Sequence, residues 1–217
     1  MELKHLIILL IVFIVIVMVL KRRSHYHEGK EVNRTHTENS YGQPSKSLYL
    51  STNVLTLHQT TEITDEDDHV VYHAKSKFFT LHDRTTVTDA HGKLVSKFKK
   101  KFFTLHQRHY VTMANGNSFE LSNEFFHLVK DITNISELGW KLEGNIVALN
   151  FTIKDKNENL IAFIGQKVLS LHDKYSIDIY DESKEAEIVT IVLVLQHMLR
   201  DRTHASQEAS RANSVEQ

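Results

Sequence analysis

Cysteine is absent from this chain of 217 residues, which excludes disulfide bonds, thiolate metal ligands and cysteine nucleophiles. Glycine is scarce, with only seven residues, so loops of the kind that hold phosphate groups or dinucleotides are not expected. The sequence also lacks the nucleophile motif of serine hydrolases, the HExxH motif of zinc peptidases and the P-loop of nucleotide hydrolases. These absences predict a protein that is not an enzyme, with no catalytic residues and no cofactor.

The chain also lacks an excess of charge, because its formal net charge at pH 7 is −1. A near-neutral protein of this kind is not a general nucleic-acid binder, so no nucleic-acid partner is expected. The charge is nevertheless distributed unevenly along the sequence. Between residues 75 and 108, nine lysines and arginines stand against two aspartates, which gives this segment a local balance of +7.

Residues 6–20 form the longest apolar run, LIILLIVFIVIVMVL, which has no polar side chain. At ~1.5 Å per helical residue this run covers about 23 Å, and the preceding residues extend it towards the ~30 Å thickness of the hydrocarbon layer. The run ends directly in Lys21, Arg22 and Arg23 without a small-residue cleavage site, which favours a retained anchor over a cleaved signal peptide. We therefore predict that residues 1–22 are a single-pass anchor in the cell membrane. The positive-inside rule then places the rest of the chain in the cytoplasm.

Two polar segments flank the remaining chain. Residues 23–46 hold one valine as their only aliphatic side chain and contain the only proline, a composition that predicts a flexible linker. Residues 201–217 are similarly polar and show no apolar period, so we predict a disordered tail. The globular domain is therefore expected within residues 47–200.

A five-residue motif is repeated along this domain. It reads FFTLH at residues 78–82 and 102–106, and looser copies are VLTLH at 54–58 and VLSLH at 168–172. The first three copies are spaced by 24 residues, a length that accommodates short strands joined by turns. Turn sequences recur with the same spacing, as DAHG at 89–92 and MANG at 113–116. The pattern predicts tandem β repeats.

Alternation within the repeats separates two faces, because successive side chains of a strand point to opposite sides of a sheet. One parity is apolar and contains side chains such as Phe79, Val87 and Val111. The other parity is polar and carries the repeated histidines His58, His82, His106 and His172. Outward side chains on successive strands of a closed sheet diverge and do not converge on one ion, so no metal site is predicted.

Further alternating segments, among them NSFELS, GWKLEG and a hairpin with a turn at residues 156–159, bring the expected number of strands to ten to twelve. A sheet of this size leaves exposed edges unless it closes, which predicts a barrel. Residues 188–199, IVTIVLVLQHML, are apolar on nearly all sides of a helix and too few to span a bilayer. We expect a helix at about residues 184–200, with Ser183 as candidate N-cap, that passes through the barrel.

Four stretches of the chain carry a resemblance to a known family: KFFTLHDRTTVTDAHGKLV, KFFTLHQRHYVTMANGNSF, GWKLEGN and HDKYSIDIYDESKEAEIVTIVLVLQHML. They resemble the LURP-one-related family, which shares a fold group with tubby C-terminal domains and phospholipid scramblases, over about residues 47–199. The resemblance implies a closed or nearly closed antiparallel barrel of about twelve strands around a hydrophobic C-terminal helix, and supplies no catalytic residues. The N-terminal anchor departs from the family pattern, as does Gln196-His197, where relatives often have an acidic residue.

The basic segment is the strongest functional asymmetry in the sequence. We select as a candidate anion-binding surface the residues Lys97, Lys99, Lys100, Lys101, Arg84 and Arg108. Such a surface would contact anionic lipid headgroups or a phosphorylated ligand, the role that the resemblance to tubby domains implies. Two alternatives stay open, namely lysines that protect an edge strand from pairing, and a protein-interaction scaffold at the membrane with no lipid ligand.

Overall fold

The computed structural model describes residues 41–51, 60–77, 84–101, 108–122, 132–167 and 174–215. The chain divides into two compact units, residues 1–43 and residues 44–217, and only residues 41–43 of the first unit are described. The predicted anchor and the four repeated histidines lie outside the described residues. Within the described ranges, no helix combines the length and the apolar character that a membrane crossing requires.

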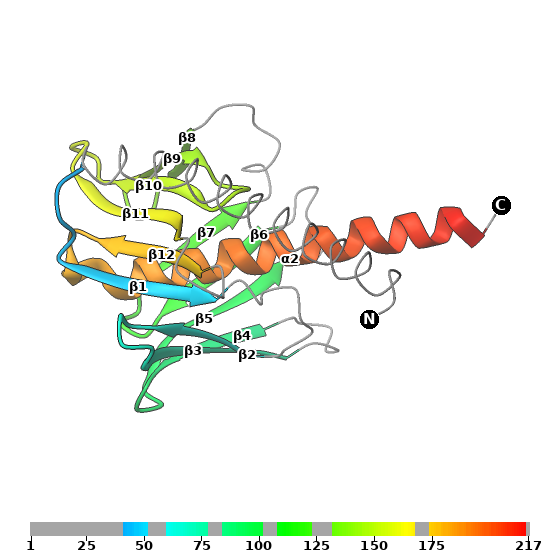
Figure 1. The fold of residues 1–217 in the computed structure, drawn as a ribbon, viewed down its shortest axis with the longest axis horizontal. Helices are drawn as coiled ribbons and strands as arrows, with labels where there is room; N and C mark the ends of the chain where they lie inside the picture. The colour runs from blue at the N-terminus through cyan, green and yellow to red at the C-terminus, as the bar shows by residue number, and fades with distance from the viewer. Residues whose placement is uncertain are drawn as a thin grey trace, which may run out of the picture. The chain divides into compact units, whose positions relative to one another are not determined.

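The second unit is built mainly from β strands (Figure 1). Twelve strands fall within its described ranges: β1 (Lys46–Ser51), β2 (Thr60–Thr64), β3 (Val70–Lys77), β4 (Arg84–Asp89), β5 (Leu94–Lys101), β6 (Arg108–Met113), β7 (Ser118–Ser122), β8 (Ile132–Ile135), β9 (Trp140–Asn145), β10 (Asn150–Lys154), β11 (Leu160–Lys167) and β12 (Lys174–Ile179). They form one antiparallel sheet in the order β7-β6-β5-β4-β3-β2-β1-β12-β11-β10-β9-β8. The two ends of the sheet come together where the backbone N–H of Glu120 donates to Oε1 of Glu137 at 3.2 Å. The predicted mainly β fold is therefore confirmed as a nearly closed barrel.

Side-chain alternation in the repeats follows the predicted parity. In β4, Thr85 and Val87 are buried while Arg84 is exposed, and in β6 the side chain of Val111 is buried. The inward parity joins the helix in one hydrophobic core. The outward parity is polar, so the character of the outer surface follows from the sequence period of two.

The predicted hairpin turns are confirmed, and three of the hairpins begin with an aspartate. Oδ1 of Asp89 accepts hydrogen bonds from the backbone N–H groups of His91 and Lys93, both at 2.9 Å. Asp65 and Asp155 accept from the residues two and four positions later in the same way. An aspartate that satisfies the backbone locally favours a turn over an extended chain. The acidic run that starts at Asp65 is thus part of a hairpin turn.

One helix runs through the interior of the barrel (Figure 1). The 3₁₀ helix η3 (Glu182–Lys184) leads into α2 (Glu185–Val215), whose residues 188–198 are all buried. The predicted central helix is therefore confirmed. Its cap differs from the prediction, because the carboxylate of Asp181 accepts the backbone N–H of Ser183, which lies inside the first turn.

Polar contacts fix both ends of the buried part of this helix in the barrel. At its start, Lys46 of β1 and the hydroxyl of Tyr72 on β3 donate to the carboxylate of Glu185 at 2.7 to 2.8 Å. Near the opposite ends of the strands, Lys100 of β5 donates to Asp201 at 3.1 Å. These contacts set the direction of α2, so that its residues after about 200 leave the barrel at the end where β5 finishes.

Helix α2 continues beyond the predicted end of the domain. The polar composition predicts a disordered tail from residue 201, but the helix extends to Val215. Residues 201–215 contain neither glycine nor proline, so nothing in this stretch interrupts the backbone hydrogen bonds. The hydroxyls of Thr203 and Ser206 donate to the carbonyl oxygens four residues earlier, as is typical of these residues within a helix. Polarity alone therefore did not distinguish a solvated helix from a disordered tail.

Candidate functional site

The outer surface of strands β3, β4 and β5 gathers exposed basic side chains. We call Lys75, Arg84, Lys97 and Lys99 the basic face, because all four are exposed and have outward parity. Lys75 and Lys97 lie on either side of Thr86 in the register of the sheet. Arg84 lies directly opposite Lys99. Neighbouring strands are about 4.8 Å apart and alternate residues of one strand about 6.6 Å apart, so the four cations share one patch.

Like charges lie directly opposite one another in this part of the sheet. Arg84 has Lys77 opposite it on β3 and Lys99 opposite it on β5. One step further along, Lys101 of β5 lies opposite Arg108 of β6. Directly opposed like charges destabilise the pairing of two strands, so the arrangement opposes folding rather than assisting it.

The basic face has no anionic partner within the described part of the chain, where none of its four side chains forms an ion pair or a hydrogen bond. The one acidic residue in strands β3 to β6 is Asp89, whose carboxylate closes its own turn. Arg108 at the border of the patch is different, because it lies 3.5 Å from the carboxylate of Glu120 on β7. The uncompensated cations create a positive potential on this side of the barrel.

The lysine-rich strand is an interior strand of the sheet. β5 pairs with β4 on one side and with β6 on the other, and the two ends of the sheet are β7 and β8. Lysines protect a sheet from aggregation only where a strand has unpaired N–H and C=O groups. The alternative that these lysines protect an edge strand is therefore excluded by the topology.

The six candidate basic residues do not all lie together. Lys100 has inward parity, lies opposite His109, and donates to Asp201 instead of facing solvent. Lys101 has outward parity, but its side chain lies outside the described part of the structure. The basic face keeps three of the six candidates and adds Lys75, which belongs to the basic segment but is not one of the six. Lys75 lies in this patch because of the register between β3 and β4, which the sequence pattern does not specify.

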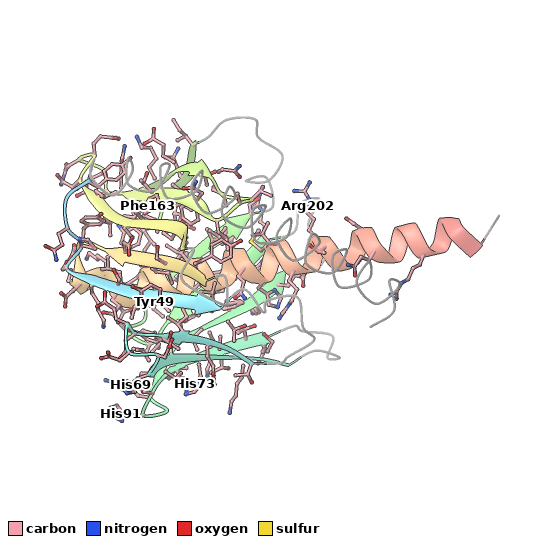
Figure 2. All side chains as sticks on the ribbon, viewed as in Figure 1. Tyr49, His69, His73, His91, Phe163 and Arg202 are labelled. Carbon is pink, nitrogen blue, oxygen red and sulfur yellow. The ribbon has the colours of Figure 1, made fainter. Side chains whose placement is uncertain are left out.

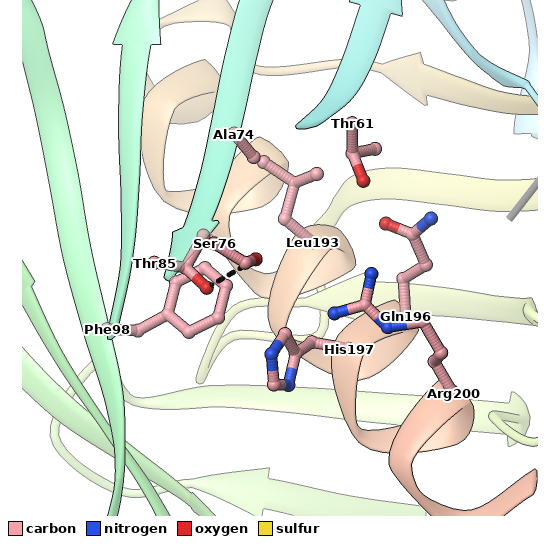
Figure 3. A pocket seen from close by; sticks show the side chains of 9 residues that line it. All are labelled: Thr61, Ala74, Ser76, Thr85, Phe98, Leu193, Gln196, His197 and Arg200. Carbon is pink, nitrogen blue, oxygen red and sulfur yellow. Dashed lines mark hydrogen bonds between the residues drawn. The ribbon is translucent and has the colours of Figure 1, made fainter. Parts of the chain in front are cut away.

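A small cavity lies between α2 and the inner side of strands β2 to β5 (Figure 3). Its lining residues are Thr61, Ala74, Ser76, Thr85, Phe98, Leu193, Gln196, His197 and Arg200. The hydroxyls of Ser76 and Thr85 bond to each other at 2.9 Å. The volume of about 10 Å³ is roughly the room of one water molecule. An organic ligand or substrate does not fit into this cavity.

Two buried histidines face each other beside this cavity. The ring centroids of His109 on β6 and His197 on α2 are 5.5 Å apart, and Phe98 contacts both rings in edge orientations. Burial lowers the pKa of His109 to about 3, with a further contribution from His197. Burial also lowers the pKa of His197 to about 4, although the carboxylate of Asp201 opposes this shift. Both imidazoles are therefore neutral at neutral pH.

His109 is buried without hydrogen bonds. Its side chain is 1% exposed, and among the described residues neither ring nitrogen has a hydrogen-bond partner. A buried polar group without a partner costs about 1–3 kcal/mol. Such groups are rare in folded proteins, and a water molecule or an ion often supplies the missing contact.

The barrel has a counterpart among known protein families. The model of the LURP-one-related family matches residues 46–196, which run from the start of β1 into the buried part of α2. No curated protein sequence matches the chain. Among solved structures, the X-ray structure of a protein from Arabidopsis thaliana is similar, with a TM-score of 0.47 and 15% sequence identity. That similarity covers 74% of this chain and 96% of the other.

Proposed function

The chain belongs to the LURP-one-related family, and we propose that it is a membrane-anchored binding module without catalytic activity. In this proposal the basic face of Lys75, Arg84, Lys97 and Lys99 contacts anionic lipid headgroups. The anchor is the apolar run of residues 6–20, and the barrel carries the lipid-binding surface. The chain is then located at the cell membrane, with the barrel in the cytoplasm.

One observation carries the proposal, namely four exposed cations on interior strands of one surface with no described anionic partner. The opposition of Arg84 and Lys99 weakens strand pairing when the protein is alone. A phosphate or carboxylate group placed between two such cations turns their repulsion into attraction for the ligand. The headgroups of anionic lipids supply charges of this kind.

The expected electrostatic contribution is large enough to matter. Each lysine or arginine close to an anionic membrane surface contributes about 1 kcal/mol. Four such residues contribute about 4 kcal/mol together, which corresponds to roughly three orders of magnitude in affinity. At physiological ionic strength, salt screens electrostatic interactions beyond a distance of about 8 Å. Only side chains that come this close to the membrane surface therefore contribute to the affinity.

The predicted anchor makes weak contacts sufficient. A barrel connected to the bilayer by the predicted linker of residues 23–46 remains near the headgroups at a high effective concentration. The cytoplasmic leaflet is the one that carries anionic lipids, and it is also the side on which the positive-inside rule places the barrel. The basic face then needs only to orient the barrel and to hold it against the bilayer, because the anchor already keeps the chain at the membrane.

The described part of the barrel interior leaves little room for a substrate. Helix α2 occupies the interior, and the cavity beside it has room for about one water molecule. The LURP-one-related family is not known to be catalytic. Within the described residues, the surface that we propose for binding is therefore the outside of the barrel.

Vesicle co-sedimentation of residues 44–217, which form a compact unit of their own, tests the proposal. We expect binding to vesicles of phosphatidylcholine with phosphatidylserine, little binding to phosphatidylcholine alone, and a strong decrease of the bound fraction in high salt. Binding that is equally weak with both lipids at low salt would refute a lipid ligand. In that case a protein-interaction scaffold at the membrane becomes the better account of this chain.

A further inference from the structure

Three possible metal ligands meet at the end of the barrel where α2 leaves it. His109 of β6 and His197 and Asp201 of α2 each offer one ligand atom, and these atoms all lie within 4.8 Å of one another. His197 and Asp201 are four residues apart and therefore share one face of the helix, with 3.8 Å between Nδ1 and Oδ1. His109 reaches the same point from the facing strand, so two separate elements build the cluster.

The donor set suits a transition metal. Two imidazole nitrogens with one carboxylate oxygen are a ligand combination used for Zn²⁺, with water in the fourth position. Metal binding uses the neutral imidazole, and the two rings lie with their centroids 5.5 Å apart, close enough for one nitrogen of each to reach the same ion. A bound ion would also give a contact to His109, whose ring nitrogens have no hydrogen-bond partner among the described residues.

The present spacing requires only a small adjustment. Ligand atoms that surround Zn²⁺ tetrahedrally at 2.0–2.1 Å lie about 3.3 Å from each other, so the side chains would move together by up to about 1.5 Å. The side chain of Asp201 is 17% exposed and is the least enclosed of the three, so it has the most room to move. The same exposure leaves an approach for the metal and for a water ligand.

Positive charge nearby opposes the cation. Lys100 donates to Oδ2 of Asp201 at 3.1 Å, and Arg200 also acts electrostatically on His197. Because Lys100 uses Oδ2 while Oδ1 is directed towards His197, the carboxylate retains one oxygen for a metal. The competing explanation is that Asp201 serves only as the ion-pair partner of Lys100.

We propose that His109, His197 and Asp201 form a Zn²⁺ site with one position open to water. This site is independent of the lipid-binding proposal and uses the opposite, inward side of the barrel wall. The outward parity of the repeated histidines predicts that they form no metal site. Neither His109 nor His197 belongs to those repeats, so that parity argument does not apply to them.

Zinc binding by the full-length chain, purified in mild detergent without a histidine tag, tests this site. After dialysis against Zn²⁺, we expect one tightly bound ion per chain by elemental analysis. Asp201→Asn should lower the zinc affinity by about tenfold or more, since it removes a charged ligand oxygen. Asparagine retains an oxygen that accepts from Lys100, which preserves the structural contact. Substitution with Co²⁺ should give a ligand-field absorption that His109→Gln abolishes.

His91→Gln is the matched control, because His91 is exposed in the turn between β4 and β5, on the outside of the barrel (Figure 2). This variant should keep both the zinc stoichiometry and the cobalt spectrum. If Asp201→Asn binds zinc as tightly as the wild type, or if His91→Gln loses as much, the ion is held elsewhere and the site is refuted. Failure of the wild type to bind zinc at all would refute it equally. Should His109→Gln fail to fold, the comparison with Asp201→Asn decides the question.

Discussion

Replacement of Leu195 by aspartate tests whether α2 lies inside the barrel. The side chain of Leu195 is fully buried. Loss of its packing costs about 3 kcal/mol, within the range of about 2–5 kcal/mol for truncation of a buried leucine. At pH 7 the new carboxyl is ionised in the unfolded chain, whereas in the core it must be protonated. With a reference pKa of ~3.9, this protonation adds about 4 kcal/mol to the loss of stability. The sum of about 7 kcal/mol is comparable with the whole stability of a domain, about 5–15 kcal/mol.

The protonation cost gives this variant a characteristic pH dependence. Burial raises the pKa of the new carboxyl above its unfolded value, so the penalty shrinks as the pH falls towards ~3.9. Between about pH 7 and pH 5 the variant Leu195→Asp should regain about 2–3 kcal/mol relative to Leu195→Asn, which has a similar shape and no titrating group. Urea unfolding monitored by the fluorescence of Trp140, the only tryptophan and a buried one, measures this difference.

The control for this experiment is Val147→Asp, which places the same carboxyl in an exposed turn, where the valine is 50% exposed. We expect this control to change the stability by less than about 0.5 kcal/mol. Two results together would contradict a helix in the interior. Leu195→Asp would unfold at the same urea concentration as Val147→Asp, and the pH dependence of its stability would equal that of Leu195→Asn.

Three further predictions follow from other parts of the chain. Gly165→Ala should lower stability by about 1–3 kcal/mol, because a Cβ there would lie 2.7 Å from the ring of Phe163; an unchanged melting temperature would contradict this. Acid should destabilise the protein from about pH 6.5 downwards, because His109 and His197 stay neutral when folded while the unfolded chain takes up protons. His109→Gln should reduce this loss of stability in acid, as measured by urea unfolding at several pH values. A variant whose stability has the same pH profile as that of the wild type would contradict the prediction. Residues 6–20 should keep the full-length chain in the membrane fraction after alkaline extraction, and its release into the supernatant would contradict the anchor.

Much of the barrel follows from local patterns in the sequence. The period of two in the repeats sets which side chains face inward, and buried Val87 and Val111 follow it. The turns are set by single aspartates and glycines, such as Asp89 and Gly92, whose φ of 79° suits glycine. The apolar residues 188–199 have no polar side that could face water, which places them in the interior.

The remaining features depend on contacts between distant residues. Parity shows that one of the consecutive lysines of β5 must point inward, but only the partner Asp201, about a hundred residues later, explains how Lys100 is accommodated. The sequence does carry a signal for buried His109, since it shares the inward parity of Val111, whereas the repeated histidines have the opposite parity. The pairing of β3 with β4, which adds Lys75 to the basic face, depends on register across the whole sheet.

Removal of two charges from the basic face is the most direct test of lipid binding. Residues 44–217 carrying Lys97→Gln and Lys99→Gln are compared with a matched double variant, Lys156→Gln and Lys184→Gln, which removes two exposed lysines outside the basic face. On vesicles with phosphatidylserine, the first variant should lose about thirtyfold in affinity, from about 2 kcal/mol, while the control stays near the wild type. The first variant should also be at least as stable as the wild type, since it removes a repulsion with Arg84. Equal affinities of the two double variants would contradict the proposal that the basic face binds anionic lipid.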